Sequence, residues 1–126
     1  MEKKIINSPL APAPIGPYNQ AVMVNGMLFI SGQIALMPST GELNMPDIET
    51  ETKQVMENLK AILNEAGLSF NHIIKTTIFL SDMAHFATVN GIYATYFSAD
   101  FPARETIAVA GLPKGVNVEI SMIAAG

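Results

Sequence analysis

The chain has 126 residues, enough for one domain with a substantial buried core, and its apolar content of 49% is ordinary for a globular protein. The net charge of −4 and the pI near 5.0 provide no electrostatic footprint for nucleic acid. The absence of cysteine excludes a disulfide, a thiolate nucleophile and a zinc–thiolate site. No secretory signal and no apolar run of membrane-spanning length is visible. We therefore expect a single domain over residues 1–126 of a soluble, cytoplasmic protein without a membrane partner.

The N-terminal part of the chain predicts an extended lead-in followed by a β-hairpin. Residues 9–14, PLAPAP, are proline-rich, and residues 15–18 continue as a turn. Asn25-Gly26 separates the apolar runs 21–24 and 27–31, and this dipeptide favours a hairpin because both central residues of a type I′ turn need positive φ. Gly32 predicts the end of the second strand, or a bulge that lets another group approach the backbone.

A helix is predicted from Pro46-Asp47 to about Ala66, with Gly67 as the residue that ends it. Its apolar stripe at helical spacing consists of Ile48, Val55, Leu59, Ile62, Leu63 and Ala66. The charged residues that lie mostly off this stripe are Glu49, Glu51, Lys53, Glu57 and Lys60. We interpret them as a solvated face without a functional role.

Residues 73–80, IIKTTIFL, predict a β-branched strand, and Ser81-Asp82 offers an N-cap for a second helix at roughly 83–97. The stripe of this helix consists of Phe86, Val89, Tyr93, Tyr96 and Phe97. Asn90 follows Phe86 by four residues and shares the stripe, so its amide needs partners. It is either bonded to a loop for structural reasons or part of a site.

The stretch from Pro102 to Ile120 predicts two strands, 105–112 and 116–124, joined by the turn residues Pro113-Lys114-Gly115. If residues equidistant from Lys114 pair, Arg104 lies opposite Ile123, and Arg104 and Glu119 point to the same face. A register that differs by one residue places them on opposite faces.

An arginine and a glutamate on one face support two interpretations. They form a cross-sheet ion pair or two solvated charges, or they form a site in which Arg104 grips a small carboxylate and Glu119 handles a proton or a water. Residues 107–110 are apolar or small, which distinguishes this region from an ordinary wet surface. These residues leave the two interpretations about equally supported.

The order of elements is two or three strands, a helix, a strand, a helix and two strands. It predicts an α+β fold, with a mixed sheet of five to six strands and two helices packed on one face. Two helices can cover only one face, yet residues 28–30 and the last two strands are rich in apolar side chains. We expect the uncovered face to pack against another copy of the chain.

Few polar residues remain as candidates for chemistry. His72 and His85 have no metal-ligand spacing with an acidic pair, and no glycine-rich phosphate loop occurs, so we expect no metal site. The candidates are Tyr18, Ser31, Asn90, Arg104 and Glu119, together with the backbone near Thr106.

Six segments in this order resemble the RidA (YjgF-type) family of reactive intermediate deaminases: IGPYNQAV at 15–22, FISGQI at 29–34, KTTIFLSDM at 75–83, FATVNGIYATYF at 86–97, FPAR at 101–104 and LPKGVNVEI at 112–120. The resemblance implies a chorismate-mutase-like subunit and a homotrimer with three clefts between subunits. It also implies hydrolysis of 2-imino acids and their enamine tautomers, such as 2-aminoacrylate, to 2-oxo acids and ammonia without a cofactor.

The resemblance also assigns roles to individual residues. It places the arginine that binds the substrate carboxylate on Arg104 and the glutamate that handles water on Glu119. Further substrate-binding positions fall on Tyr18, Ser31 and Asn90. Many members carry a cysteine two residues after the arginine, where this chain has Thr106; this removes a thiol role and leaves the backbone N–H and C=O available.

Three functional interpretations follow from the sequence. The first is an imine/enamine deaminase, and the second is a non-enzymatic trimer that senses a small carboxylate and regulates a partner protein. Glu119 separates them, because a pure carboxylate binder gains nothing from a second negative charge near its ligand. The third, RNA binding or cleavage, has been attached to members of the family, but the acidic pI and the lack of a basic–aromatic patch disfavour it.

Overall fold

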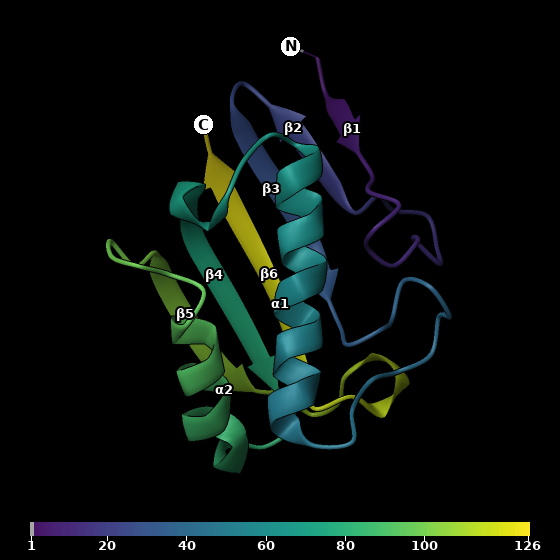
Figure 1. Cartoon of the computed structure of the whole chain (residues 1–126), viewed down its shortest axis with the longest axis vertical. Helices are drawn as coiled ribbons and strands as arrows, with labels where there is room; N and C mark the ends of the chain where they lie inside the picture. Colours follow the sequence, from purple (N-terminus) through teal and green to yellow (C-terminus); the bar gives the residue numbers. More distant parts are fainter. Residues whose placement is uncertain (1) are drawn as a thin grey trace.

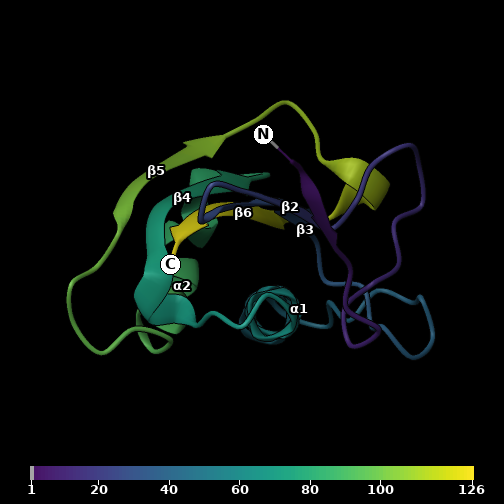
Figure 2. The same cartoon turned by 90° about the horizontal axis from the view of Figure 1, so that it is seen from above.

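The computed structural model describes residues 2–126 and places two helices against one face of a six-stranded mixed sheet (Figures 1 and 2). The strands are β1 (Lys4–Ile6), β2 (Ala21–Val24), β3 (Met27–Gln33), β4 (Ile73–Leu80), β5 (Ala103–Ala108) and β6 (Val118–Ala125), and the helices are α1 (Ile48–Glu65) and α2 (Phe86–Ala94). The strand order is β1-β2-β3-β6-β4-β5. The predicted α+β class, with both helices on one face, is confirmed.

The β2–β3 hairpin forms around Asn25-Gly26 as predicted. Both residues have positive φ, 49° and 76°, as a type I′ turn requires. The pairing of β3 with β6 shifts register between Ile30 and Gln33, so the predicted bulge at Ser31-Gly32 is also present. This bulge lies beside the start of β6, and it shapes part of the candidate site.

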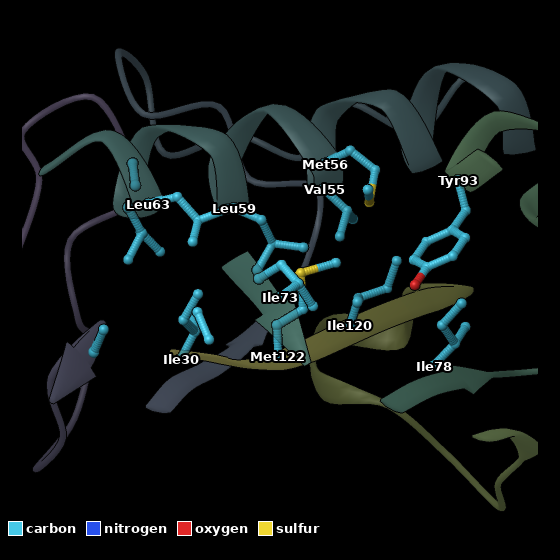
Figure 3. Close-up of a cluster of buried hydrophobic side chains, with 14 of the residues drawn as sticks. Ile30, Val55, Met56, Leu59, Leu63, Ile73, Ile78, Tyr93, Ile120 and Met122 are labelled. Atoms are coloured by element: carbon cyan, nitrogen blue, oxygen red, sulfur yellow. The ribbon is translucent and has the colours of Figure 1, made fainter. Parts of the chain in front are cut away.

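Helix α1 begins after Asp47, whose carboxylate accepts a 2.7 Å hydrogen bond from the Thr50 N–H, and Gly67 follows its end with φ 75°. The predicted bounds are therefore correct to within about a residue. Figure 3 shows its apolar face packed against β3, β4 and β6. The buried residues of that face include Val55, Met56, Leu59, Ile62 and Leu63.

Glu51 of α1 contradicts the prediction of a solvated charged face, because it is completely buried. Its carboxylate accepts hydrogen bonds from the N–H groups of Asn117 (2.8 Å) and Val118 (3.1 Å) and from Nδ2 of Asn117 (3.0 Å). The first turns of α1 lie against the start of β6, where backbone N–H groups need an acceptor. Glu51 thus ties α1 to the segment that leads to Glu119.

The second helix is shorter than the predicted span of 83–97. Residues 83–85 form a 3-10 turn, capped by Asp82 through the Ala84 N–H (2.8 Å), and α2 proper ends at Ala94. Tyr93 and Phe97 lie in the core below it, and Phe86 and Tyr96 are partly buried beside them.

The predicted terminal hairpin is wrong, because β4 lies between β5 and β6. Strand β5 pairs with β4 in parallel, and β6 pairs with β4 and β3 in antiparallel orientation. The β4–α2–β5 unit is a crossover that returns the chain parallel to β4. The turn signal at Pro113–Gly115 marks a 3-10 turn within a long connection that passes over the face of the sheet opposite the helices (Figure 2).

This strand order also changes the predicted register. Arg104 lies opposite Thr76 and not opposite Ile123, whereas Glu119 lies opposite Phe79. Thr76 and Phe79 are three residues apart on one strand, so their side chains point to opposite faces. The equidistant pairing around Lys114 that would put Arg104 and Glu119 on one face is therefore wrong, and the two lie on opposite faces: Arg104 faces the helices, and Glu119 faces away from them.

We call the surface of the sheet away from α1 and α2 the open face. Strand pairing puts three exposed large apolar side chains on it: Ile5 (43% exposed), Phe29 (44%) and Ile107 (46%). Over residues 2–126, neither helix combines the length and the hydrophobicity needed to cross a bilayer.

Candidate active site

The predicted site residues fall into two clusters on opposite faces of the sheet. The Glu119 cluster consists of Tyr18, Ser31, Gly32 and Glu119, which line one cavity. The Arg104 cluster lies at the β5 edge and consists of Arg104 with the three α2 residues that its guanidinium contacts, Phe86, Asn90 and Tyr93. The sequence predicted one site, and each cluster holds half of it.

The cavity of the Glu119 cluster has a volume of about 370 Å³. Tyr18, Ser31 and Glu119 supply polar groups to it. The apolar part of the wall comes from Pro12, Ala13, Ile15, Ile34, Leu36 and Pro113. A mainly apolar cavity with a few convergent polar groups is the usual form of a small-molecule site.

Glu119 is seated against the β3 bulge. A Cβ atom at position 32 would overlap Oε2 of Glu119, so the glycine provides the space in which the carboxylate lies. Burial raises the pKa of the Glu119 carboxyl above its ordinary value. A carboxylate with a raised pKa is a better proton acceptor at neutral pH than an ordinary glutamate.

Ser31 and Tyr18 contribute to the cavity in different ways. The Ser31 hydroxyl donates to the carbonyl of Asn19 (2.7 Å), and the Ser31 N–H donates to the carbonyl of Gln20 (2.9 Å), so Ser31 fixes the segment that follows Tyr18. Tyr18 is 47% exposed, and its hydroxyl oxygen has only a long contact of 3.4 Å with the Ile15 N–H. The Tyr18 hydroxyl is therefore the more available group for a ligand.

Gln20 is a residue of this region that the sequence reasoning missed. It is buried, and its amide accepts from the Ser8 N–H (2.6 Å) and donates to the carbonyls of Ser8 (3.0 Å) and Pro12 (2.9 Å). These bonds hold the proline-rich lead-in where it forms the cavity wall. The prolines were the available signal, since residues without N–H groups form few backbone pairs and leave carbonyls that need donors.

In the Arg104 cluster, Nη1 of Arg104 donates a 2.7 Å hydrogen bond to Oδ1 of Asn90. The guanidinium carbon lies 5.8 Å from the ring centroid of Phe86 and 5.2 Å from that of Tyr93. Arg104 itself is exposed beside a cavity of about 420 Å³. Of the two interpretations of Asn90, a loop contact is wrong, because its partner is the arginine of the candidate site.

Thr106 lies two residues beyond Arg104 on the same strand and faces the same side of the sheet. Among the side chains of residues 2–126, its hydroxyl is the buried polar group that has no hydrogen-bond partner. A buried hydroxyl without a partner costs free energy, so it marks the interior next to Arg104 as a place where a polar contact is missing.

The two clusters cannot act on one small ligand within a single chain. Two strand spacings of about 4.8 Å and three residues of about 3.3 Å separate Arg104 and Glu119, so their Cα atoms are roughly 14 Å apart, with side chains on opposite faces. Each cluster therefore holds one of the two charged groups of the predicted site.

Neither charge is neutralised within the part of the chain that the structure describes. The single ion pair among residues 2–126 joins Lys75 and Glu105 at 2.6 Å, on the open face. The same residues contain no group of three or more histidine, aspartate or glutamate side chains placed to hold a metal ion. His72 instead caps a 3-10 turn, where its Nδ1 accepts from the Ser69 N–H (3.0 Å).

Comparisons with known proteins agree with this architecture. A family model described as Endoribonuclease L-PSP matches residues 8–126. The chain is 50% identical over 122 residues to the 2-iminobutanoate/2-iminopropanoate deaminase of Mus musculus, covering 97% of this chain and 90% of the mouse protein. It is 52% identical over 121 residues to the putative regulator AldR of Lactococcus lactis subsp. lactis, covering 96% of each.

Solved structures agree as well. A protein of the conserved Rid family from Yersinia pestis superposes with a TM-score of 0.97 at 48% identity, covering 99% of this chain and all of that one. The segments that resembled RidA proteins thus lie in a chain whose sequence and fold both match that family over nearly their whole length. The chain belongs to the YjgF/RidA family, whose family model carries the description Endoribonuclease L-PSP.

Proposed function

We propose that this chain hydrolyses 2-imino acids of the 2-iminobutanoate and 2-iminopropanoate type, with their enamine tautomers such as 2-aminoacrylate, to 2-oxo acids and ammonia. One observation carries the proposal: Glu119 and Arg104 both lack a charge partner within residues 2–126. Glu119 is a half-buried carboxyl with a raised pKa, and Arg104 is an exposed guanidinium. The mouse relative named 2-iminobutanoate/2-iminopropanoate deaminase gives independent support for this substrate class.

The proposed chemistry needs a carboxylate clamp and one proton acceptor. Arg104 binds the substrate carboxylate with its planar, permanently charged fork. Glu119 takes a proton from a water molecule as the water oxygen attacks the imine carbon, and the C=N electron pair moves to nitrogen. Glu119 returns this proton to nitrogen, which gives a carbinolamine with a hydroxyl and an amino group on the same carbon. Glu119 then takes the hydroxyl proton as the C=O bond forms and passes it to the amino nitrogen as the C–N bond breaks, so that ammonia leaves a 2-oxo acid. Water and proton transfer suffice for this sequence, so we propose it without a cofactor.

The other predicted residues have supporting roles in this scheme. Tyr18 orients the substrate through its available hydroxyl, and Ser31 holds the segment that carries Tyr18. The backbone N–H and C=O groups near Thr106, on the edge strand β5 two residues beyond the clamp, supply further contacts to the substrate.

The site is completed by a second copy of the chain. Because Arg104 and Glu119 lie on opposite faces of one sheet, we propose that the Glu119 cluster of one subunit meets the Arg104 cluster of the next. Three copies arranged in a ring give three equivalent clefts, and the exposed apolar side chains of the open face become buried between subunits. The net charge of −4 and the missing basic patch give no reason to add nucleic acid or a membrane as a partner.

The proposal is tested by generating 2-aminoacrylate or 2-iminopropanoate in situ and measuring ammonia and 2-oxo acid release. Wild type is expected to accelerate release, and Arg104→Ala and Glu119→Gln are each expected to lose most of that acceleration. The two inactive variants are then unfolded and refolded as an equal mixture. Random trimers should recover roughly a quarter of the wild-type rate, because each site draws each intact residue with a probability of one half.

The mixing experiment separates a shared site from a site within one chain. No recovery in mixed trimers, with each variant folded, contradicts the shared cleft. No acceleration by wild type contradicts the deaminase itself.

The second candidate function is a regulatory trimer that binds a small carboxylate without catalysis. The similarity to a relative named putative regulator AldR supports this candidate. In that case Glu119→Gln retains or improves binding of a 2-oxo acid, since it removes a negative charge near the ligand. A wild type that binds 2-oxobutanoate but hydrolyses no imine favours this candidate.

A further inference from the structure

We propose that Phe86, Asn90 and Tyr93 are positioning residues for Arg104, so that helix α2 acts on the bound carboxylate through the guanidinium and not by touching the ligand. This inference rests on the proposed function, because it deepens the role of the carboxylate clamp. We call the three residues the arginine cradle.

The cradle is one face of α2. Phe86, Asn90 and Tyr93 follow one another at spacings of four and three residues, which places them on the same side of the helix. All three contact the Arg104 side chain, which comes from the neighbouring edge strand β5. Both ring centroids lie within the distance at which an aromatic face attracts a guanidinium.

The cradle is anchored to the strand that pairs with β5. The Tyr93 hydroxyl donates to Oγ1 of Thr76 (2.9 Å), and Thr76 is the residue directly opposite Arg104 on β4. Tyr93 is buried, its ring lies 4.8 Å from that of Phe97, and burial raises the pKa of its hydroxyl. Figure 3 shows Tyr93 pointing from α2 towards the sheet, near Ile78 and Ile120. The ring that the guanidinium contacts is therefore fixed.

The side-chain carbonyl oxygen of Asn90 accepts a hydrogen bond from Arg104. Because this amide is neutral, the guanidinium keeps its full charge. One of the five N–H donors of the arginine is bonded, and the others remain for a planar carboxylate. Among residues 2–126, no carboxylate pairs with Arg104. An aspartate at position 90 would make the same hydrogen bond but neutralise the charge and repel the ligand. The amide is thus the group that orients Arg104 without competing for it.

The test is a double-mutant cycle on the binding of 2-oxobutanoate, a stable product, measured by calorimetry. Asn90→Ala is expected to weaken binding roughly tenfold in the wild-type background. In the Arg104→Ala background the same change is expected to have no further effect, since a positioning residue acts only through the group it positions. Losses that add in the double variant show a direct contact of Asn90 with the ligand and overturn the inference.

Asn90→Asp provides the matched control for shape. The cradle predicts that this isosteric change abolishes 2-oxobutanoate binding while leaving the melting temperature equal or higher, because the new carboxylate pairs with Arg104. Binding equal to wild type overturns the inference, since a purely structural hydrogen bond is made equally well by aspartate.

Kinetics give a second readout. Asn90→Ala is expected to raise KM for the imine more than it lowers kcat, because the clamp holds substrate and transition state alike. An equal loss in kcat with unchanged KM overturns the inference. A wild type that binds no 2-oxobutanoate overturns it too, whereas a wild type that binds it and hydrolyses no imine overturns only the proposed function.

Discussion

Gly32 is the residue that allows the Glu119 carboxylate to lie against the β3 bulge. Gly32→Ala places a Cβ atom where Oε2 lies, so the carboxylate must move, although the φ of Gly32 is not in the left-handed region. We expect the rate of imine hydrolysis to fall by roughly a hundredfold, the lower end of what a positioned proton acceptor contributes. The measurements are kcat for imine hydrolysis and the thermal unfolding temperature of the variant and of the wild type.

Gly111→Ala is the matched control, because an added Cβ there meets no atom within 4 Å and the backbone φ is again ordinary. It should leave both rate and melting temperature near wild type. A Gly32→Ala variant with full activity would show that catalysis does not require the Glu119 carboxylate to lie in the space beside Gly32.

Glu119 also gives the protein a distinct dependence of stability on pH. Burial raises its pKa in the folded chain, so the native state holds this proton more tightly than the unfolded state. Glu119 therefore makes the free energy of unfolding fall as pH rises. The fall begins at the pKa of this carboxyl in the unfolded chain, near 4.5, and continues through its raised pKa in the folded chain.

Glu119→Gln should consequently be more stable than wild type at pH 7. The difference should vanish below about pH 4, where the Glu119 carboxyl of the wild type is protonated in the folded and in the unfolded protein alike. Urea unfolding at the two pH values measures it. A loss of stability at pH 7 would instead show that the ionised Glu119 carboxylate makes a stabilising contact in the folded protein.

Helix α1 is tied to β6 by the buried carboxylate of Glu51. Glu51→Ala leaves the N–H groups of Asn117 and Val118 without an acceptor, at about 1–3 kcal/mol for each buried donor, so we expect a loss of roughly 3 kcal/mol or more in unfolding free energy. Glu51→Gln should restore most of it, because the amide oxygen can accept both backbone bonds. Urea denaturation of both variants is the measurement, and equal losses would show that charge, and not acceptance, matters here.

The elements that the sequence predicts well carry their signals locally. Asn25-Gly26 fixes a hairpin through two positive φ angles, Asp47 and Gly67 bound α1, and residues 73–80 form β4 with the predicted limits. The burial of Glu51 escaped prediction because the helical stripe describes one face of α1 and not what lies beyond its first turns.

Strand order escaped prediction because it is set by contacts distant in sequence. The turn residues around Lys114 are real, but no local pattern indicates that β4 separates β5 from β6. The faces of Arg104 and Glu119 followed from that assumed pairing, so the error passed directly into the site. The identities of the site residues came from the family resemblance, and their separation into two clusters required the sheet.

At the scale of the whole molecule, the open face predicts assembly. Phe29 is 44% exposed on this face, and we expect the wild type to sediment as a trimer at micromolar concentration, with Phe29→Glu shifting it towards monomer. Analytical ultracentrifugation measures the shift, with circular dichroism as a check that the variant is folded.

Leu10→Glu serves as the control, because Leu10 is 73% exposed on the proline-rich lead-in and not on the sheet. It should sediment like wild type. A wild type that remains monomeric contradicts both the assembly and the shared cleft.

The position of β6 between β3 and β4 has a consequence for how the protein is made. During synthesis, β3 and β4 leave the ribosome before the strand that joins them, so the two sides of the sheet exist for a time as separate edges. Pairing of strands that are distant in sequence closes a long loop, and the chain loses entropy before the new contacts form. This order of events slows folding. The nascent chain is therefore exposed to aggregation until Val118–Ala125 has emerged, and a chaperone that shields the β3 and β4 edges would act in that interval.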